Sequence, residues 1–211
     1  MGRYSQETGG GDFQQAPVGT HVARCIRLID LGTQTNEYEG KETKRNQVLV
    51  MWELCYEMME SDEGAKPFIV SRFYTNSLNE KATLRHDLAQ WRGRDFTDEE
   101  CKKFDLQSIL GHPCMLSVIS NEKGKSKVGG VMKMPKGQEA PAPKNEPYAF
   151  WLDEFNRASF EALSEGIKKI IMKSPEYQTI TAPLPPPTAS QAAVAQMKGK
   201  KFSDMDDDIP F

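Results

Sequence analysis

The chain has 211 residues, of which 38% are hydrophobic and 27% charged, and its formal net charge is -3 at pH 7. A chain of this length is expected to form one domain with tails. No stretch approaches the roughly 20 consecutive apolar residues that a membrane span needs, and the first residues lack the apolar segment of a secretory signal. We therefore expect a cytoplasmic protein with no role in a membrane.

The four cysteines are expected to be reduced packing residues rather than disulfides or metal ligands, because none forms a C-x-x-C pair. They are Cys25, Cys55, Cys101 and Cys114. His112 lies close to Cys114 in the sequence, but the other histidines do not have ligand spacing from this pair. The sequence therefore predicts neither a metal site nor another cofactor.

The negative charge is not spread evenly along the chain. Residues 17–137 carry 18 Lys and Arg against 17 Asp and Glu, whereas residues 138–211 carry 8 against 11. A negative protein at first argues against a nucleic-acid partner, since phosphate binding normally leaves a basic footprint. Because the excess of acid lies in the C-terminal part, the argument does not apply to the core.

Three strands are predicted in the first half of the core. Residues 20–31, 47–58 and 68–75 are rich in β-branched and apolar residues, and the second run alternates with a period of two. Residues 1–16 are Gly- and Gln-rich, which predicts a flexible arm. The polar residues 32–46 are numerous for a connection, which favours a functional loop.

A helix is predicted after the third strand. Ser77 and Glu80 have the spacing of a capping box, and apolar residues follow at helical intervals as far as Gly93. Thr97 and Glu100 have the spacing of a second capping box, which predicts a short helical stretch towards Gly111.

The remaining segments are predicted from changes in composition. Two further strands are expected at 113–120 and 127–134, followed by a linker at 138–147. Residues 148–172 have an apolar stripe at helical spacing, which predicts a helix that packs on the core or on a second subunit. Residues 173–203 are of low complexity and predict disorder ahead of an acidic tip at 204–211.

Five strands with a helix between the third and fourth are typical of an OB-fold, a small all-β barrel that binds oligonucleotides on its second and third strands and between two loops. Here the two loops would be residues 32–46 and 121–126. Basic residues beside aromatic ones suit a phosphate backbone whose bases stack. The candidate DNA-binding residues of the loops are Tyr38, Lys41, Lys44, Arg45, Lys123, Lys125 and Lys127.

The third strand supplies two more candidates. Phe68, Val70, Arg72 and Tyr74 share one face, and the charge of Arg72 indicates that this face is not the sealed core. Arg72 and Tyr74 are therefore candidates for phosphate contact and base stacking. The alternative is that Tyr74 packs with its hydroxyl at the rim and that Arg72 is merely solvated. Trp52 has the apolar register of its strand and favours the core.

The last six residues, Asp206, Asp207, Asp208, Ile209, Pro210 and Phe211, are an acidic run that ends in Ile-Pro-Phe. This motif, behind a Pro- and Gln-rich linker, resembles the C-terminal tip of bacterial single-stranded DNA-binding proteins, which recruits partner proteins. The stretches GTHVARCIRLIDLGTQ, YTNSLNEKATLRHDLAQWRGRDFT and FDLQSILG resemble phage-encoded single-stranded DNA-binding proteins over residues 17–137. That resemblance implies an OB-fold and single-stranded DNA as the ligand, and it assigns no contact to a single position.

The leading hypothesis is a non-enzymatic module that coats single-stranded DNA during replication, recombination or repair and recruits other proteins through its tip. A second hypothesis is an adaptor whose OB-like core binds protein instead of DNA. A metal-dependent nuclease is a third, with Glu53 or Asp30 as conceivable ligands, against the simpler interpretation of solvated surface charge. Because no nucleophile or phosphate-binding loop is present, the sequence predicts no catalytic residue.

Overall fold

A computed structural model describes residues 14–38, 40–61 and 64–182 of the chain. The chain divides into a compact unit, residues 1–180, and a second unit, residues 181–211. The predicted acidic tip, residues 204–211, lies outside the described residues. The elements are β1 (Gly19–Tyr38), β2 (Lys41–Met59), β3 (Lys66–Thr75), α1 (Thr83–Arg92), α2 (Asp98–Lys103), the 3-10 helix η1 (Leu106–Ile109), β4 (Pro113–Ser120), β5 (Ser126–Met132), β6 (Tyr148–Phe150), α3 (Arg157–Glu161), α4 (Glu165–Ile171) and α5 (Pro175–Thr181).

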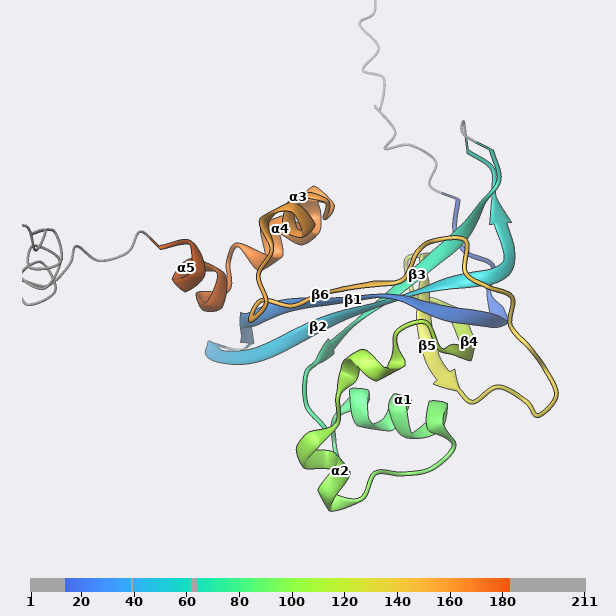
Figure 1. The fold of residues 1–211 in the computed structure, drawn as a ribbon, viewed down its shortest axis with the longest axis horizontal. Helices are drawn as coiled ribbons and strands as arrows, with labels where there is room; N and C mark the ends of the chain where they lie inside the picture. The colour runs from blue at the N-terminus through green and yellow to red at the C-terminus, as the bar shows by residue number, and fades with distance from the viewer. Residues whose placement is uncertain (1–13, 39, 62–63, 183–211) are drawn as a thin grey trace, which may run out of the picture. The chain divides into compact units, whose positions relative to one another are not determined.

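The fold is mostly β, as predicted, and is built on one sheet (Figure 1). The strand order is β3-β2-β1-β4-β5 with antiparallel neighbours, and β6 pairs with β1 in parallel. One face carries the apolar side chains of alternate positions, such as Val48, Val50 and Trp52 on β2. These residues pack with Leu84, Leu88 and other side chains of α1 in the main core.

Strands β1 and β2 extend well beyond the predicted boundaries. They pair from Ala23 with Leu54 to Tyr38 with Lys41, and the register shifts at two points along the ladder. The predicted loop 32–46 is therefore wrong, because residues 32–38 and 41–46 belong to the paired strands of a β-hairpin. Its residues are polar on both faces, so no alternation of apolar and polar residues marks it as a strand. Backbone pairing and several β-branched threonines are enough to continue the ladder.

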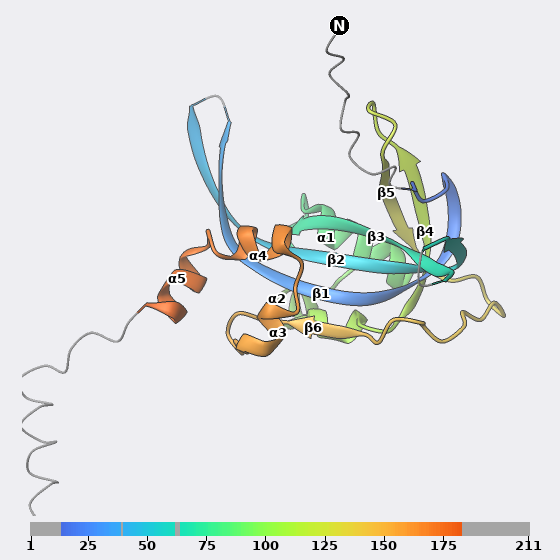
Figure 2. The same cartoon turned by 90° about the horizontal axis from the view of Figure 1, so that it is seen from above.

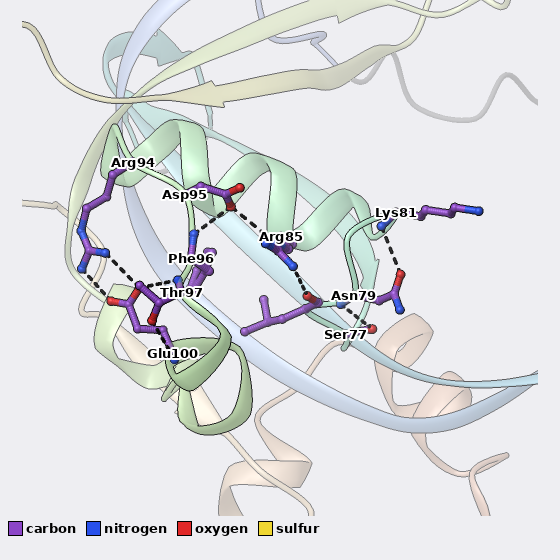
Figure 3. Close-up of polar contacts among 10 residues, drawn as sticks. Ser77, Asn79, Lys81, Arg85, Arg94, Asp95, Phe96, Thr97 and Glu100 are labelled. Carbon is purple, nitrogen blue, oxygen red and sulfur yellow. Dashed lines mark hydrogen bonds and ion pairs between the residues drawn. The ribbon is translucent and has the colours of Figure 1, made fainter.

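Helix α1 begins later than the predicted capping box. The Ser77 hydroxyl accepts a hydrogen bond from the N–H of Asn79, and the N-cap of α1 is Ala82 (Figure 3). The prediction that Gly93 ends the helix is confirmed, because Gly93 has φ 73° and a left-handed conformation. The second capping box is confirmed as well. In it, Thr97 accepts from the Glu100 N–H, and the Glu100 carboxylate accepts from the Thr97 N–H.

Residues 148–180 form a C-terminal layer of β6, α3, α4 and most of α5 instead of the predicted single helix over 148–172. The side chain of Asn156 caps α3 by accepting from the Ser159 N–H. The apolar side chains of this layer cover Ile29, Leu31 and Leu49 on the face of the sheet opposite the main core. Burial in residues 148–172 does not follow the stripe seen in the sequence, because Ala158 and Ala162 of that stripe are exposed. The buried residues are instead Phe150, Leu152, Phe160, Leu163 and Ile171.

The predicted linker, residues 138–147, belongs to a strap that we define as residues 133–147. It is held to the sheet at two points. Arg24 donates to the carbonyls of Ala140 and Pro141, at 2.8 and 3.1 Å. Glu53 accepts from the Lys144 N–H at 2.8 Å and from the backbone and side-chain amides of Asn145 at 2.9 and 2.6 Å. Glu53 is only 2% exposed, so the interpretation of solvated surface charge is wrong for this residue.

Three of the four cysteines are buried, and all four are free thiols. Residues 14–16 also differ from the predicted flexible arm, because Ala16 is buried and Gln15 accepts a hydrogen bond from the Ser126 N–H. Among the helices that the structure describes, none has the length and apolar character to cross a membrane.

Candidate nucleic-acid interface

The outward face of β3 carries a row of exposed side chains that the sequence pattern did not predict. We define the outer row as Ile69, Ser71 and Phe73, which alternate with the partly or fully buried Val70, Arg72 and Tyr74. Phe73 is 52% exposed and Ile69 38% exposed. An aromatic ring that is half exposed on a strand presents a flat apolar surface of the kind on which a base stacks.

Opposite the outer row, two side chains of the neighbouring strand are buried, and the exposed ring of that strand, Tyr56, lies beyond the residues that pair with Ile69 and Phe73. In the β2–β3 ladder, Leu49 lies opposite Phe73 and Glu53 lies opposite Ile69. Leu49 is buried by the C-terminal layer, whereas Glu53 is buried by its bonds to the strap. Between Ile69 and Phe73, exposure is therefore greater on β3 than on the residues of β2 that pair with it.

A hollow of about 510 Å³ lies at the C-terminal end of β3, and we call it the first hollow. Phe73 lines it together with three cationic side chains, Arg45 from β2, Arg72 from β3 and Lys81 from the segment before α1. Arg45 and Lys81 are exposed. Figure 3 shows the Lys81 side chain extending away from Asn79, whose carboxamide accepts from the Lys81 N–H. An aromatic ring among three cations matches the alternation of bases and phosphates in a nucleic-acid strand.

The structure places Tyr74 in the main core, contrary to the prediction of an open face. Its side chain is 3% exposed, and its hydroxyl donates to the Asp87 carboxylate on α1 at 2.7 Å. Burial and the neighbouring Asp87 charge both raise the pKa of the Tyr74 phenol above its ordinary value. The ring also packs edge-on against Trp52. Tyr74 is thus a core residue whose hydroxyl is satisfied by α1.

Arg72 lies between the core and the first hollow. Its guanidinium donates to the same Asp87 carboxylate at 3.0 Å and lies over the Tyr74 ring. The side chain remains 28% exposed and lines the hollow. Arg72 can therefore face a phosphate at the wall of the hollow, although its first partner is a carboxylate of the fold.

The remaining predicted basic residues lie on two hairpins. Lys44 and Arg45 are exposed on β2, and Lys44 is 3.6 Å from Glu42. Lys123, Lys125 and Lys127 are exposed on the β4–β5 hairpin. In Figure 2 the β1–β2 and β4–β5 hairpins project to the same side, one from each end of β1. Tyr38 and Lys41 pair through their backbones at the tip of the first hairpin, and their side chains lie outside the described part of the structure.

The surroundings of Asp30 do not support the nuclease hypothesis, because its carboxylate already has partners in the fold. Its carboxylate accepts from the N–H groups of Gly32 and Leu152, and burial raises its pKa. Within residues 14–38, 40–61 and 64–182, no group of three or more His, Cys, Asp or Glu side chains could hold a metal ion.

No model of a known protein family matches the chain, and no curated protein matches its sequence. The functional interpretation consequently rests on the geometry of β3, its hollow and the two hairpins.

Proposed function

We propose that the protein binds single-stranded DNA along β3, without strong sequence preference, and that its core is an OB-fold. The strand order β3-β2-β1-β4-β5 is that of an OB barrel opened between β3 and β5. These two strands contact each other, and α1 contacts both of them. The second and third strands of an OB-fold form its usual binding face for oligonucleotides.

The single observation that carries the proposal is the position of Phe73. It is the most exposed large apolar side chain of β3, and it lies in the same hollow as Arg45, Arg72 and Lys81. Stacking accepts any base, because every base has a π-face, and the cations contact phosphates that do not differ between sequences. This arrangement supports coating of a strand rather than recognition of a site.

The acidic tip supports a second part of the proposal, which is the recruitment of partner proteins. Asp206, Asp207 and Asp208 precede Ile209, Pro210 and Phe211. A partner with a basic rim and an apolar pocket would bind this segment, because the rim speeds encounter and the pocket holds the apolar side chains. We propose that the tip recruits replication, recombination or repair proteins to the coated strand. Cytoplasmic location and the absence of catalytic activity belong to the same proposal.

The test is a titration of fluorescent oligo-dT by anisotropy at low and high salt. Removal of a stacking aromatic weakens binding by about 1–3 kcal/mol per base, so Phe73→Ala is expected to lower affinity by at least about fivefold, given 1.4 kcal/mol per tenfold. Met172→Ala is the matched control, since Met172 is 50% exposed on the C-terminal layer and lines neither β3 nor the first hollow.

Binding is also expected to weaken as salt rises, because counterions are released from the phosphates. If Phe73→Ala kept the affinity of the wild type, the outer row would not be the stacking surface. If oligo-dT did not bind even at low salt, the core would have to be assigned to the adaptor hypothesis.

A further inference from the structure

A second hollow lies at the opposite end of β3, and it shares no lining residue with the first hollow. Its volume is about 680 Å³, within the range of roughly 300–1,000 Å³ in which small molecules are bound. Its lining combines apolar and polar side chains of β3 and of neighbouring segments with two lysines. These residues include Phe68, Ile69, Ser71 and Gln14, with Lys66 from β3 and Lys144 from the strap.

The strap builds one wall of this second hollow. Lys144 and Asn145 both line it, and their backbone N–H groups are fixed on the Glu53 carboxylate. The Lys144 side chain is exposed, with its ammonium 3.6 Å from the Met58 sulfur. The anchored backbone therefore presents a cation at a defined position beside β3.

The outer row joins the two hollows. Ile69 and Ser71 line the second hollow, and Phe73, the next outward residue, lines the first. At about 3.3 Å per residue, the ten residues of β3 span roughly 30 Å. A strand that stacks on Phe73 and continues along this row would reach Ile69 and the two lysines.

We propose that the second hollow is a further subsite for single-stranded DNA, completed by Lys144 of the strap. This inference rests on the proposed function of β3. Lys66 and Lys144 contact phosphates, and the apolar surface of Phe68 and Ile69 receives a base or a sugar. The strap thereby becomes part of the DNA interface, rather than a connection between two parts of the chain.

The test compares Lys144→Gln with Lys136→Gln in the full-length protein. Lys136 is an exposed lysine of the same strap that lines neither hollow, so its replacement removes the same charge elsewhere. Both variants are expected to fold normally, because the bonds to Glu53 come from the backbone of residue 144 and not from its side chain. Equal melting temperatures would verify this.

Affinity is measured for short and long oligo-dT, chosen near the limits of about 4–16 nucleotides that one OB-fold covers. For single-stranded DNA, the loss of one phosphate contact makes the negative slope of log K against log salt shallower by about 0.7. For the long oligonucleotide, Lys144→Gln is expected to show that loss and an affinity several-fold below that of Lys136→Gln. For the short one, which the first hollow can hold alone, the two variants are expected to agree within about twofold.

The outcomes separate this inference from the function on which it rests. If the wild type bound neither oligonucleotide, the proposed function would fail. If the wild type bound the long oligonucleotide more tightly and Lys144→Gln equalled Lys136→Gln in affinity and in salt slope, DNA would bind β3 without the strap and the second subsite would be rejected.

Discussion

Replacing Glu53 by Ala tests the anchoring of the strap. The Glu53 carboxylate is buried and accepts three hydrogen bonds, two from backbone N–H groups and one from the Asn145 carboxamide. Hydrogen bonds to a charged group contribute about 1.5–3 kcal/mol each, but the released N–H groups regain water and such contributions are not additive. We therefore expect a loss of about 2–4 kcal/mol in the free energy of unfolding. Glu53→Gln keeps one good acceptor and is expected to lose about half as much.

The free energy of unfolding is measured by urea titration at neutral pH, with tryptophan fluorescence as the signal. A separate experiment measures hydrogen exchange of the backbone amides of Lys144 and Asn145 in the folded protein. Faster exchange confined to these amides would locate the loss at the strap. Glu146→Ala is the control, because Glu146 is an exposed carboxylate of the same strap. A Glu53→Ala variant as stable as this control, with slow exchange at both amides, would refute the view that Glu53 holds the strap.

Three further predictions follow from the protonation states and hydrogen bonds. Hydrogen bonds from Arg94, and then from a backbone N–H, lower the pKa of Glu100 from 4.5 to about 2, so its stabilising contribution is present above pH 4.5 and disappears as the pH falls to 2. The difference in melting temperature between wild type and Glu100→Gln is expected to shrink over that interval, and a constant difference would contradict the assignment. Tyr74→Phe removes a hydrogen bond to a carboxylate and is expected to lower stability by about 1.5–3 kcal/mol in urea unfolding, with oligo-dT affinity unchanged because the ring is buried. Burial raises the pKa of Cys25 to about 12 and that of Cys114 well above its ordinary value. At pH 8 both thiols are expected to resist iodoacetamide until the protein is unfolded, as mass spectrometry would show.

The strands that contribute to the main core could be predicted because their side chains alternate between core and outside. The predicted strand 113–120 coincides with β4, and the predicted 68–75 lies within β3. The alternation of apolar and polar side chains ends where β1 and β2 extend beyond the core, and for this reason the sequence predicted a loop at residues 32–46. Only the backbone ladder of the hairpin, which leaves no hydrophobic pattern, continues there.

The sequence predicted a DNA-binding surface on the face of β3 that carries Arg72 and Tyr74, whereas the interface proposed from the structure lies on the opposite face of the same strand. The charge of Arg72 indicated an open face, although the buried Asp87 of α1 neutralises that charge inside the fold. An ion pair between a strand and a distant helix leaves no local signal in the sequence. Phe73 lies on the opposite face of β3 from Arg72, and the apolar residue Ile69 lies on the same face as Phe73. This pair of apolar residues at alternate positions was the feature of the sequence that could have indicated the outer row.

The C-terminal layer explains why the proposed interface narrows to one strand. An OB-fold uses the outward faces of its second and third strands, but here Leu49 lies beneath the layer and Glu53 beneath the strap. The covered residues of β2 form a border beside the outer row of β3. A DNA strand bound to that row would therefore have this border on one side and would meet Lys81 at the C-terminal end of β3. A border of this kind helps to fix the path of the DNA backbone without contacts that distinguish one base from another. Coating of any single-stranded sequence requires both properties.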